Sequence, residues 1–487
     1  MKRTFVLVTL RVTQALTWSV RGTSGTWVAL VGAWLAAACM ALSAEVAPEA
    51  PPILRAGTAK KDITPAQPVK LEGYGSRKDL SQGVHDPLSA RAVAFQQDGQ
   101  RLVLVSTDIC GFYGGAAPSM RKAILAECGL RPSELFLAAV HTHSGPTLAL
   151  ERATEDGGRT TEGGDGQRVT AGSTPVRRPS PVVRREVHPN NVQYTKTLQT
   201  QLVAVVREAL AHPVPVRIEV GSGSSPVGAN RREYVRDAAG KVKVRLGRNP
   251  DRPTDHEVQV LEVLRTGDGG PAAVIFAYAT HSTTMGPHNY LISGDVHGLA
   301  EQFLEQYFAA GLVAPGFAGA SGNVDPWFRV LPKFRTDKGW IPEAVLLGTM
   351  LGEEVVHVSD RGLRPTPSGP IRTAFRTLDL PRQPRAVLDG TGDDEPPEFN
   401  LTVGRLGDVA VVGLGGEVFN ETGKAIKAAS PFPHTFIITH CNGTAGYMPT
   451  ADAYPEGGYE VESSQFAPAA ADQLVQEAAR LLREIRR

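Results

Sequence analysis

A short apolar segment that runs into two histidines is the feature that most constrains what this chain can fold into. Residues 136–140 (FLAAV) have the composition of a buried strand, and His141, His143 and a Ser-Gly-Pro turn follow directly. Side chains two apart on a strand point to the same side, so the pattern predicts that both imidazoles face one direction. Neutral imidazoles are good zinc ligands, with Zn–N distances of about 2.0–2.1 Å. The alternative interpretation is two half-buried histidines that are hydrogen-bonded at a strand end.

Four other apolar runs also lead to a side chain that can bind a metal. They are 273–280 before His281, 314–319 before Asp325, 403–413 before Glu417 and 435–439 before Tyr447. The carboxyl ends of strands in open α/β sheets gather at one edge, so these distant side chains are expected to converge. Two or three protein ligands and one open position are typical of a catalytic zinc site, because the metal must keep a water to activate.

The order of predicted elements favours an α/β fold. A buried strand over 101–106 is followed by a helix over 119–128 and then by the strand that carries the two histidines. Apolar residues at helical spacing predict further helices over 192–212, 296–308, 341–357 and 469–486. There is no internal repeat and no clear second domain. We therefore predict mixed β-sheets flanked by helices in a single catalytic domain, residues 54–487, with the metal site at the C-terminal ends of strands.

The N-terminal residues differ from the rest of the chain. Four basic residues among the first 21 precede an uncharged apolar run over 27–44. This order is typical of a secretory signal peptide, which predicts export to the periplasm or the cell exterior. The run is also close to the minimum length for crossing a bilayer, so an uncleaved N-terminal anchor is the rival interpretation of residues 1–44. Residues 45–53 are predicted to be a Pro/Ala-rich linker.

Two internal segments lack periodicity. Residues 152–187 are polar and rich in Gly, Pro and Arg, which predicts a disordered insertion at the surface. Residues 226–252 are interpreted as a loop-rich excursion between two strands. Within it, Arg231 and Arg232 are interpreted as a solvated charge pair rather than a clamp for substrate.

Composition excludes some classes of function. Hydrophobic residues make up 41% and charged residues 21% of the chain, and the formal net charge is +1. A nucleic acid is therefore not expected as a partner, and the whole-chain charge gives no reason to expect an anionic surface. After the N-terminal segment, Cys110, Cys128 and Cys441 are too few and too scattered for a disulfide framework, so free buried thiols are expected.

Read together, these motifs resemble the catalytic domain of the neutral/alkaline non-lysosomal ceramidase family, whose members hydrolyse the amide bond of N-acylsphingosines. The resemblance runs from about Ala56 to the C-terminus. Its motifs are Gly57, Asp62-Ile63-Thr64-Pro65, His85-Asp86-Pro87-Leu88, His141-Thr142-His143-Ser144-Gly145-Pro146, Thr280-His281, Ser293-Gly294-Asp295, Gly416-Glu417 and Gly446-Tyr447. The resemblance implies a zinc-ligand set of His141, His281, Glu417 and Tyr447. It also implies that His143 lines the site beside the substrate.

The chain departs from the ceramidase pattern in two places. Where the family carries its catalytic serine, this chain has Asp325, and Ser321 lies four residues too early. The sequence also ends without the C-terminal immunoglobulin-like domain of ceramidases. Membership of the family is therefore better supported than ceramide as the substrate.

These observations predict an exported zinc hydrolase that cleaves an amide bond in an N-acyl lipid or a related small-molecule N-acyl substrate through a zinc-activated water. Zinc would be held by His141, His281 and Glu417, and Tyr447 would be a weak fourth ligand or a donor to the oxyanion. His143 would orient the substrate or shuttle a proton, and Asp325 would be the general base in place of the serine. A lipid-like substrate would bring the protein into contact with a membrane surface.

Alternatives stay open at this point. Glu417 precedes a helix and can simply favour the helix N-terminus electrostatically, and Tyr447 can be an aromatic at the rim of the site. The competing function is a catalytically silent, metal-containing envelope protein that binds a lipid or a glycan. Loss of the serine supports this alternative, whereas retention of every ligand type argues against it.

Overall fold

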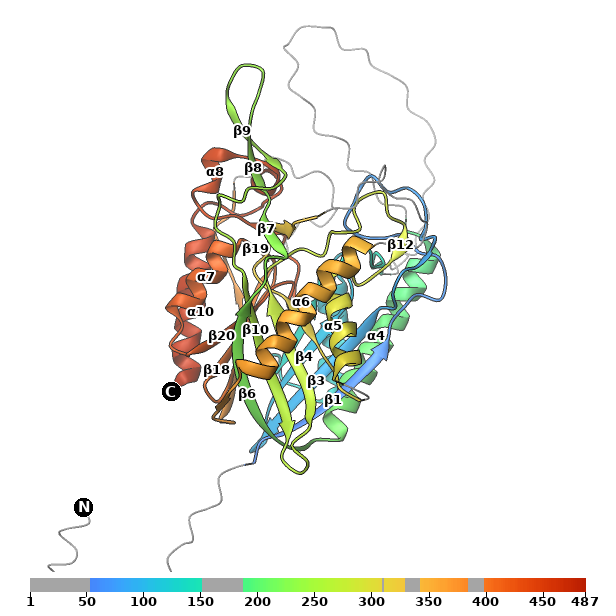
Figure 1. Ribbon diagram of the computed structural model, residues 1–487, viewed down its shortest axis with the longest axis vertical. Helices are drawn as coiled ribbons and strands as arrows, with labels where there is room; N and C mark the ends of the chain where they lie inside the picture. The colour runs from blue at the N-terminus through green and yellow to red at the C-terminus, as the bar shows by residue number, and fades with distance from the viewer. Residues whose placement is uncertain (1–52, 151–186, 309–310, 329–341, 384–397) are drawn as a thin grey trace, which may run out of the picture. The chain divides into compact units, whose positions relative to one another are not determined.

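The computed structural model describes residues 53–150, 187–308, 311–328, 342–383 and 398–487 (Figure 1). The predicted signal or anchor segment, all but the last residue of the predicted linker, and the predicted insertion up to residue 186 lie outside these ranges. No helix within the described ranges is long and apolar enough to cross a membrane.

The strands form one large sheet, one smaller sheet and several two-stranded pairs. The large sheet has the order β13-β11-β10-β6-β1-β3-β4-β5, with β15 paired to β6, and the smaller sheet has the order β16-β17-β18-β20. The strands of the large sheet are β1 Arg55–Asp62, β3 Ser89–Gln97, β4 Gln100–Thr107, β5 Leu135–Ala139, β6 Val214–Ser224, β10 Glu257–Arg265, β11 Pro271–Tyr278, β13 Gly316–Ala318 and β15 Arg364–Thr366. Those of the smaller sheet are β16 Ile371–Leu378, β17 Phe399–Leu406, β18 Val409–Leu414 and β20 His434–Ile438. The pairs are β2 Gly83–Val84 with β12 Leu291–Ile292, β7 Gly228–Asn230 with β14 Val324–Pro326, β8 Arg232–Arg236 with β9 Val242–Leu246, and β19 Glu417–Val418 with β21 Tyr447–Met448.

Helices cover the outer faces of both sheets (Figure 1). They are α3 Ala116–Cys128, α4 Pro189–Ala211, α5 Asp295–Tyr307, α6 Pro342–Arg361, α7 Asn420–Ala429, α8 Ala453–Glu456, α9 Tyr459–Glu462 and α10 Ala470–Arg486. Helices α3 and α4 pack on strands β1, β3, β4 and β5 of the large sheet, and α5 and α6 pack on β10 and β11. Helices α7 and α10 pack on the smaller sheet. The prediction of mixed sheets flanked by helices is therefore confirmed.

The inner faces of the two sheets pack against each other. Phe95 and Phe136 from the large sheet share one core with Val411 and Phe436 from the smaller sheet. Strand β5 is therefore buried on both faces, which explains why it is a continuous apolar run (LFLAA). Each fully buried aromatic or aliphatic side chain contributes about 1.5–3 kcal/mol to folding.

The two ends of the large sheet come together, and this closure places the site. β5 and β13 stand at opposite ends of the strand order but contact each other, and Ser106 Oγ on β4 donates to the Gly316 carbonyl on β13 at 2.7 Å. Just beyond β5 and β11, Thr142 and Ser282 form a parallel bridge, and the His143 amide donates to the Ser282 carbonyl at 3.0 Å. The ends of β5 and β11 therefore lie side by side, although five strands separate them in the sheet.

Two expectations need correction. The excursion at 226–252 is not simply a loop, because it contains β7 and the β8–β9 hairpin. Its strands carry charged and half-exposed residues and lack the apolar run that would have marked them. The cysteines at 110, 128 and 441 are free, as predicted, but Cys128 is only partly buried.

A pH effect on stability follows from the pairing of β6 with β10. Glu262 and Glu219 are register partners. Burial is the larger cause and the charge of Glu219 is the second cause that raises the pKa of Glu262 from 4.5 to about 7. The unfolded chain therefore releases this proton at a lower pH than the folded chain, so stability falls as pH rises between about 4.5 and 7. We expect Glu262→Gln to remove this fall and to raise the unfolding free energy at pH 8 by about 1–2 kcal/mol, a value discounted for partial solvation.

Urea denaturation at pH 4.5 and pH 8 measures this difference. Glu257→Gln on the same strand is the matched control, because Glu257 forms an ion pair with Lys427 at 2.7 Å and its loss should destabilise the protein at pH 8. The same pH dependence in wild type and Glu262→Gln would contradict the assignment.

Candidate functional site

Three side chains that the sequence singles out converge beyond the ends of β5 and β11. His141 Nε2 lies 3.6 Å and His281 Nε2 lies 3.4 Å from the same atom, Oε2 of Glu417. The three donor atoms all lie within 4.8 Å of one another, and all three residues are buried. The imidazoles of His141 and His281 meet edge to face with ring centres 4.5 Å apart. These residues come from three distant parts of the chain and form one cluster.

The backbone at His141 differs from the prediction. Strand β5 ends at Ala139, and His141 has a φ of 62°, in the left-handed region. Strand alternation is therefore the wrong reason for the shared direction of the two imidazoles, although His143 Nε2 does lie 3.3 Å from His141 Nε2. A non-glycine residue in this region carries strain of about 1–3 kcal/mol, and such residues cluster at functional sites.

Backbone carbonyls orient both metal-competent histidines. His141 Nδ1 lies 2.7 Å from the Cys110 carbonyl, and His281 Nδ1 lies 2.8 Å from the Ser321 carbonyl. Because a carbonyl only accepts, Nδ1 must carry the proton in each ring, and Nε2 presents its lone pair to the site. This is the arrangement by which proteins fix the tautomer of a metal-binding histidine.

The cluster fits a tetrahedral zinc ion. Two ligands that are each 2.0–2.1 Å from such an ion are about 3.3–3.4 Å apart. The observed separations of 3.4 Å and 3.6 Å are close to this value. Oε2 of Glu417 is also a buried oxygen without a hydrogen-bond donor among the described residues, as expected of an atom that faces a cation.

Burial keeps the imidazoles of His141 and His143 neutral, which is the form that binds metals. It lowers the pKa of His141 well below its usual value, and it lowers the pKa of His143 to about 3. Burial opposes ionisation of Glu417, but the nearby imidazoles of His141 and His281 hold the pKa of this carboxyl well below its usual range. The neutral His141 imidazole and the Glu417 carboxylate are therefore available as ligands at neutral pH.

Tyr447 lies beside Glu417 as the pairing of their strands requires. The two residues are register partners in the parallel pair β19–β21. Burial, followed by the Glu417 charge, raises the pKa of Tyr447 well above 10, so its hydroxyl keeps its proton. The predicted neighbourhood of Tyr447 is therefore present, and its oxygen is available as a donor or a weak ligand.

Three residues of the site were missed or set aside by sequence reasoning. Tyr113 donates its hydroxyl to Glu417 Oε1 at 3.2 Å. His440 stacks on His141 with ring centres 3.8 Å apart, and Gly73 leaves room for His143, since a Cβ there would lie 2.3 Å from its ring. The one sequence feature that could have indicated Tyr113 is its position in a glycine-rich segment, residues 111–115 (GFYGG).

Arg231 and Arg232 were wrongly interpreted as a solvated pair. Both are buried, and both bind Glu460 of α9 at 2.8 Å. Arg231 also reaches the metal-competent cluster, because its Nη1 lies 3.2 Å from His281 Nε2. A metal ion bound to His281 Nε2 would occupy the lone pair that Arg231 now contacts, so this contact would be lost when the metal binds. The ion pair between Arg231 and Glu460 can persist in both states.

Asp325 is another partner of Arg231 and is the middle residue of the short strand β14. It is completely buried, and its two oxygens accept from Arg231 at 3.1 Å and from Arg248 at 3.4 Å. Arg231 therefore connects Asp325 to His281. The sequence correctly predicted that Asp325 and His281 lie near each other, but nothing in it indicated that two arginines bind the Asp325 carboxylate.

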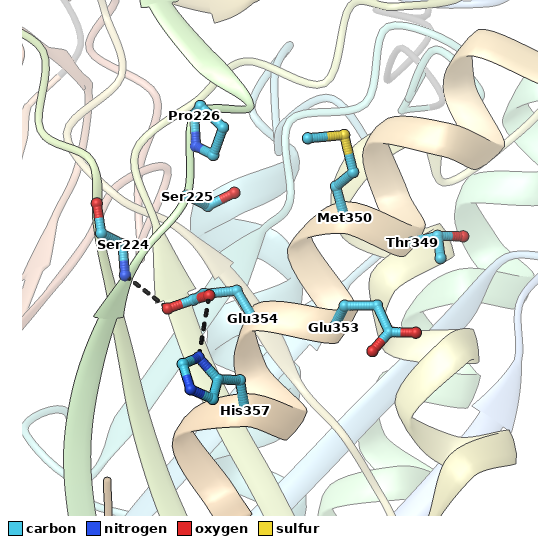
Figure 2. A pocket seen from close by; sticks show the side chains of 8 residues that line it. All are labelled: Ser224, Ser225, Pro226, Thr349, Met350, Glu353, Glu354 and His357. Atoms are coloured by element: carbon cyan, nitrogen blue, oxygen red, sulfur yellow. Dashed lines mark hydrogen bonds and ion pairs between the residues drawn. The ribbon is translucent and has the colours of Figure 1, made fainter. Parts of the chain in front are cut away.

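Two cavities lie away from this cluster. The larger, about 470 Å³, lies between the end of β6 and helix α6. Figure 2 shows that Glu354 points toward the Ser224 backbone and His357, whereas Glu353 points away from them. A smaller cavity of about 170 Å³ lies between the loop after β1 and α4. Neither cavity is lined by the converged residues, so we assign the site from its chemistry and not from cavity size.

Comparison of sequences finds ceramidases. No family model matches the chain. Neutral ceramidase 2 of Arabidopsis thaliana is 28% identical over 264 residues, which are 52% of this chain and 30% of that protein. Neutral ceramidase of Pseudomonas aeruginosa is 27% identical over 294 residues, 57% of this chain and 38% of that protein. The match thus spans well under half the length of these curated relatives.

Comparison of structures gives the same result over more of the chain. The crystal structure of neutral ceramidase from Pseudomonas aeruginosa matches with a TM-score of 0.67 and 20% identity, covering 90% of this chain and 75% of that one. A ceramidase complexed with C2 matches with a TM-score of 0.68 and 21% identity, covering 89% and 76%. The chain therefore has a neutral ceramidase-like fold, and the resemblance drawn from the sequence motifs is confirmed.

Proposed function

We propose that this protein is a zinc-dependent amidase that hydrolyses an N-acyl lipid such as ceramide, or a related N-acyl compound. The observation that carries the proposal is the convergence of two imidazole nitrogens on one carboxylate oxygen, with separations that suit a tetrahedral ion. The similarity to neutral ceramidases supports amide hydrolysis as the reaction class. Export remains a proposal that rests on residues 1–44 alone.

Zinc bound to His141, His281 and Glu417 would lower the pKa of a water and polarise the scissile carbonyl. The chain's own residues keep the ligands ready for this role. The carbonyls at Cys110 and Ser321 fix the two imidazoles, and Tyr113 holds the far oxygen of Glu417. Ligands that are oriented in advance do not need to reorganise during the reaction.

Proton transfer falls to Asp325 and His143. Asp325 is ion-paired with two guanidinium groups, so it is in the charged form that can accept a proton at a carboxylate oxygen. His143 lies beside the ligand cluster and can orient the substrate or pass the proton to the leaving amine. Both arginines also stabilise the negative charge of this carboxylate.

Tyr447 is the candidate donor to the oxyanion that develops on the carbonyl oxygen. Its hydroxyl keeps its proton at neutral pH and lies beside Glu417. Arg231 packs against it, with the guanidinium carbon 5.4 Å from the centre of the Tyr447 ring. We assign Arg231 as a positioning residue for Tyr447 and Asp325. Removing one such oxyanion donor typically costs about 10²–10³ in kcat.

The second candidate is a catalytically silent protein that keeps the metal and binds a lipid or a glycan. Its support is Asp325, which stands at the serine position of ceramidases and is already occupied by two arginines. Such a protein would bind zinc and lipid without turnover.

Turnover separates the two candidates. We expect purified full-length protein to hydrolyse at least one short-chain fluorogenic substrate from a panel of N-acylsphingosines, N-acyl amino acids and simple esters. A chelator should abolish the activity, and added zinc should restore it. Protein that contains about one zinc per chain and turns over no member of the panel would favour the silent protein.

A further inference from the structure

The β8–β9 hairpin, residues 232–246, extends beyond the sheets next to α8 (Figure 1). Its base adjoins the site, because Arg231 immediately precedes β8 and Arg232 is anchored by Glu460. An isolated two-stranded ribbon has few apolar neighbours to bury its side chains against. The surface of this hairpin therefore calls for an explanation.

Large apolar side chains are exposed on one face of the hairpin. The exposed fractions are 48% for Tyr234, 48% for Val242 and 38% for Leu246. The register pairs Tyr234 with Val244, and residues two apart on a strand share a face, so these side chains belong to the same face. Exposed apolar residues grouped on one projecting element mark an interaction surface.

The hairpin is also basic, although the whole chain has a net charge of only +1. Residues 233–246 carry four basic and two acidic side chains, which gives a local net charge of +2. Lys243 and Arg245 are paired with Asp237 and Glu233. Arg236 and Lys241, which flank the turn, form no ion pair within the described part of the chain. Their charge is available to an anionic partner.

Exposed aromatics extend this surface to the rim of the site. Tyr459 of α9 is 49% exposed, and its ring centre lies 5.6 Å from that of Tyr447. Trp327 is also exposed, two residues after Asp325, and its carbonyl accepts from Arg248 at 3.1 Å. Exposed aromatic side chains therefore lie next to Tyr447 and close in sequence to Asp325, on the side of the site where the hairpin begins at Arg232.

We propose that the hairpin docks this protein on an anionic lipid bilayer. Val242 and Leu246 enter the interfacial region, and Arg236 and Lys241 contact the headgroups, the arrangement by which amphipathic elements bind membranes. The inference rests on the proposed function, since a lipid-like substrate would be reached from such a surface. It gives a physical basis to the membrane contact that the sequence predicted only through the substrate.

Co-sedimentation with vesicles tests the proposal without any measurement of turnover. Wild-type protein should bind vesicles that contain phosphatidylglycerol more strongly than pure phosphatidylcholine vesicles, and high salt should weaken this binding. Val242→Asp with Leu246→Asp should lower the partition coefficient about tenfold. Arg236→Ala with Lys241→Ala should lower it by a similar factor, and only on the anionic vesicles.

Two controls make the result specific. Val214→Asp with Leu346→Asp places the same charges at exposed apolar positions away from the hairpin and should leave binding unchanged. His281→Ala should also bind vesicles as wild type does, so docking and hydrolysis can fail independently. Equal binding of the hairpin variant and this surface control, equal binding to both lipids, or no binding by wild type would each overturn the proposal.

Discussion

His281→Ala should release zinc and abolish hydrolysis while the fold persists. His281 is one of three strong ligands found among the described residues, and His141 and Glu417 cannot hold a tetrahedral ion tightly with Tyr447 as a weak ligand at most. We expect the zinc content to fall from about one ion per chain to near zero, and activity to fall to background. Elemental analysis of the gel-filtered protein measures the first effect, and the fluorogenic assay measures the second.

The matched control is His297→Ala. His297 is also completely buried, but it contacts Ser282 at 2.9 Å and the Tyr278 carbonyl at 3.2 Å and does not reach Glu417. The His297→Ala substitution should lower the free energy of unfolding but should not release zinc. Full zinc in His281→Ala, or equal loss in both variants with an intact circular dichroism spectrum, would show that the ligand set is wrong.

The fold was largely predictable because its elements are buried in simple ways. The strand predicted at 101–106 is β4, Gln100–Thr107, and the helix predicted at 469–486 is α10, Ala470–Arg486. The first is buried on nearly every residue, and the second buries one stripe at helical spacing, so both leave a clear pattern. The β8–β9 hairpin leaves a weaker signal, because β9 alternates apolar and basic residues (VKVRL) but forms no buried apolar run.

The geometry of the site was predicted only in part. Parallel strand ends at one sheet edge were the expected cause of convergence. The large sheet is mostly antiparallel, however, and His141 and His281 meet because its two ends approach each other. Closure of a sheet depends on contacts between residues that are distant in sequence. Periodicity along the chain carries no information about them.

Buried charge was the other limit. In the sequence, Arg231 and Arg232 look like solvated residues, since arginine is rarely buried without a partner. Their partner, Glu460, lies far along the chain and shows no pattern that links it to them. Whether a charge is solvated or paired is decided by tertiary structure, and single-sequence reasoning therefore fails at such positions.

Asp325→Asn should leave zinc bound and lower kcat by about 10²–10⁴, the usual contribution of a general base. The amide keeps the size of the side chain but cannot take a proton from the attacking water. The acidic limb of kcat/KM, where protonation of this group removes the base, should also disappear from the pH profile. Asp325→Ser should not restore full ceramidase activity, because the pocket that faces the lipid must match as well.

The substitution also removes a partner of Arg231 and Arg248, so loss of the base must be separated from loss of the ion pair. Glu460→Gln is the matched variant, because Glu460 binds Arg231 at 2.8 Å and leaves Asp325 in place. If Asp325 is the base, kcat should fall far more in Asp325→Asn than in Glu460→Gln. Equal losses would mean that Asp325 acts by positioning Arg231. An unchanged kcat would exclude the general-base role, and loss of zinc from Asp325→Asn would make this residue a metal ligand.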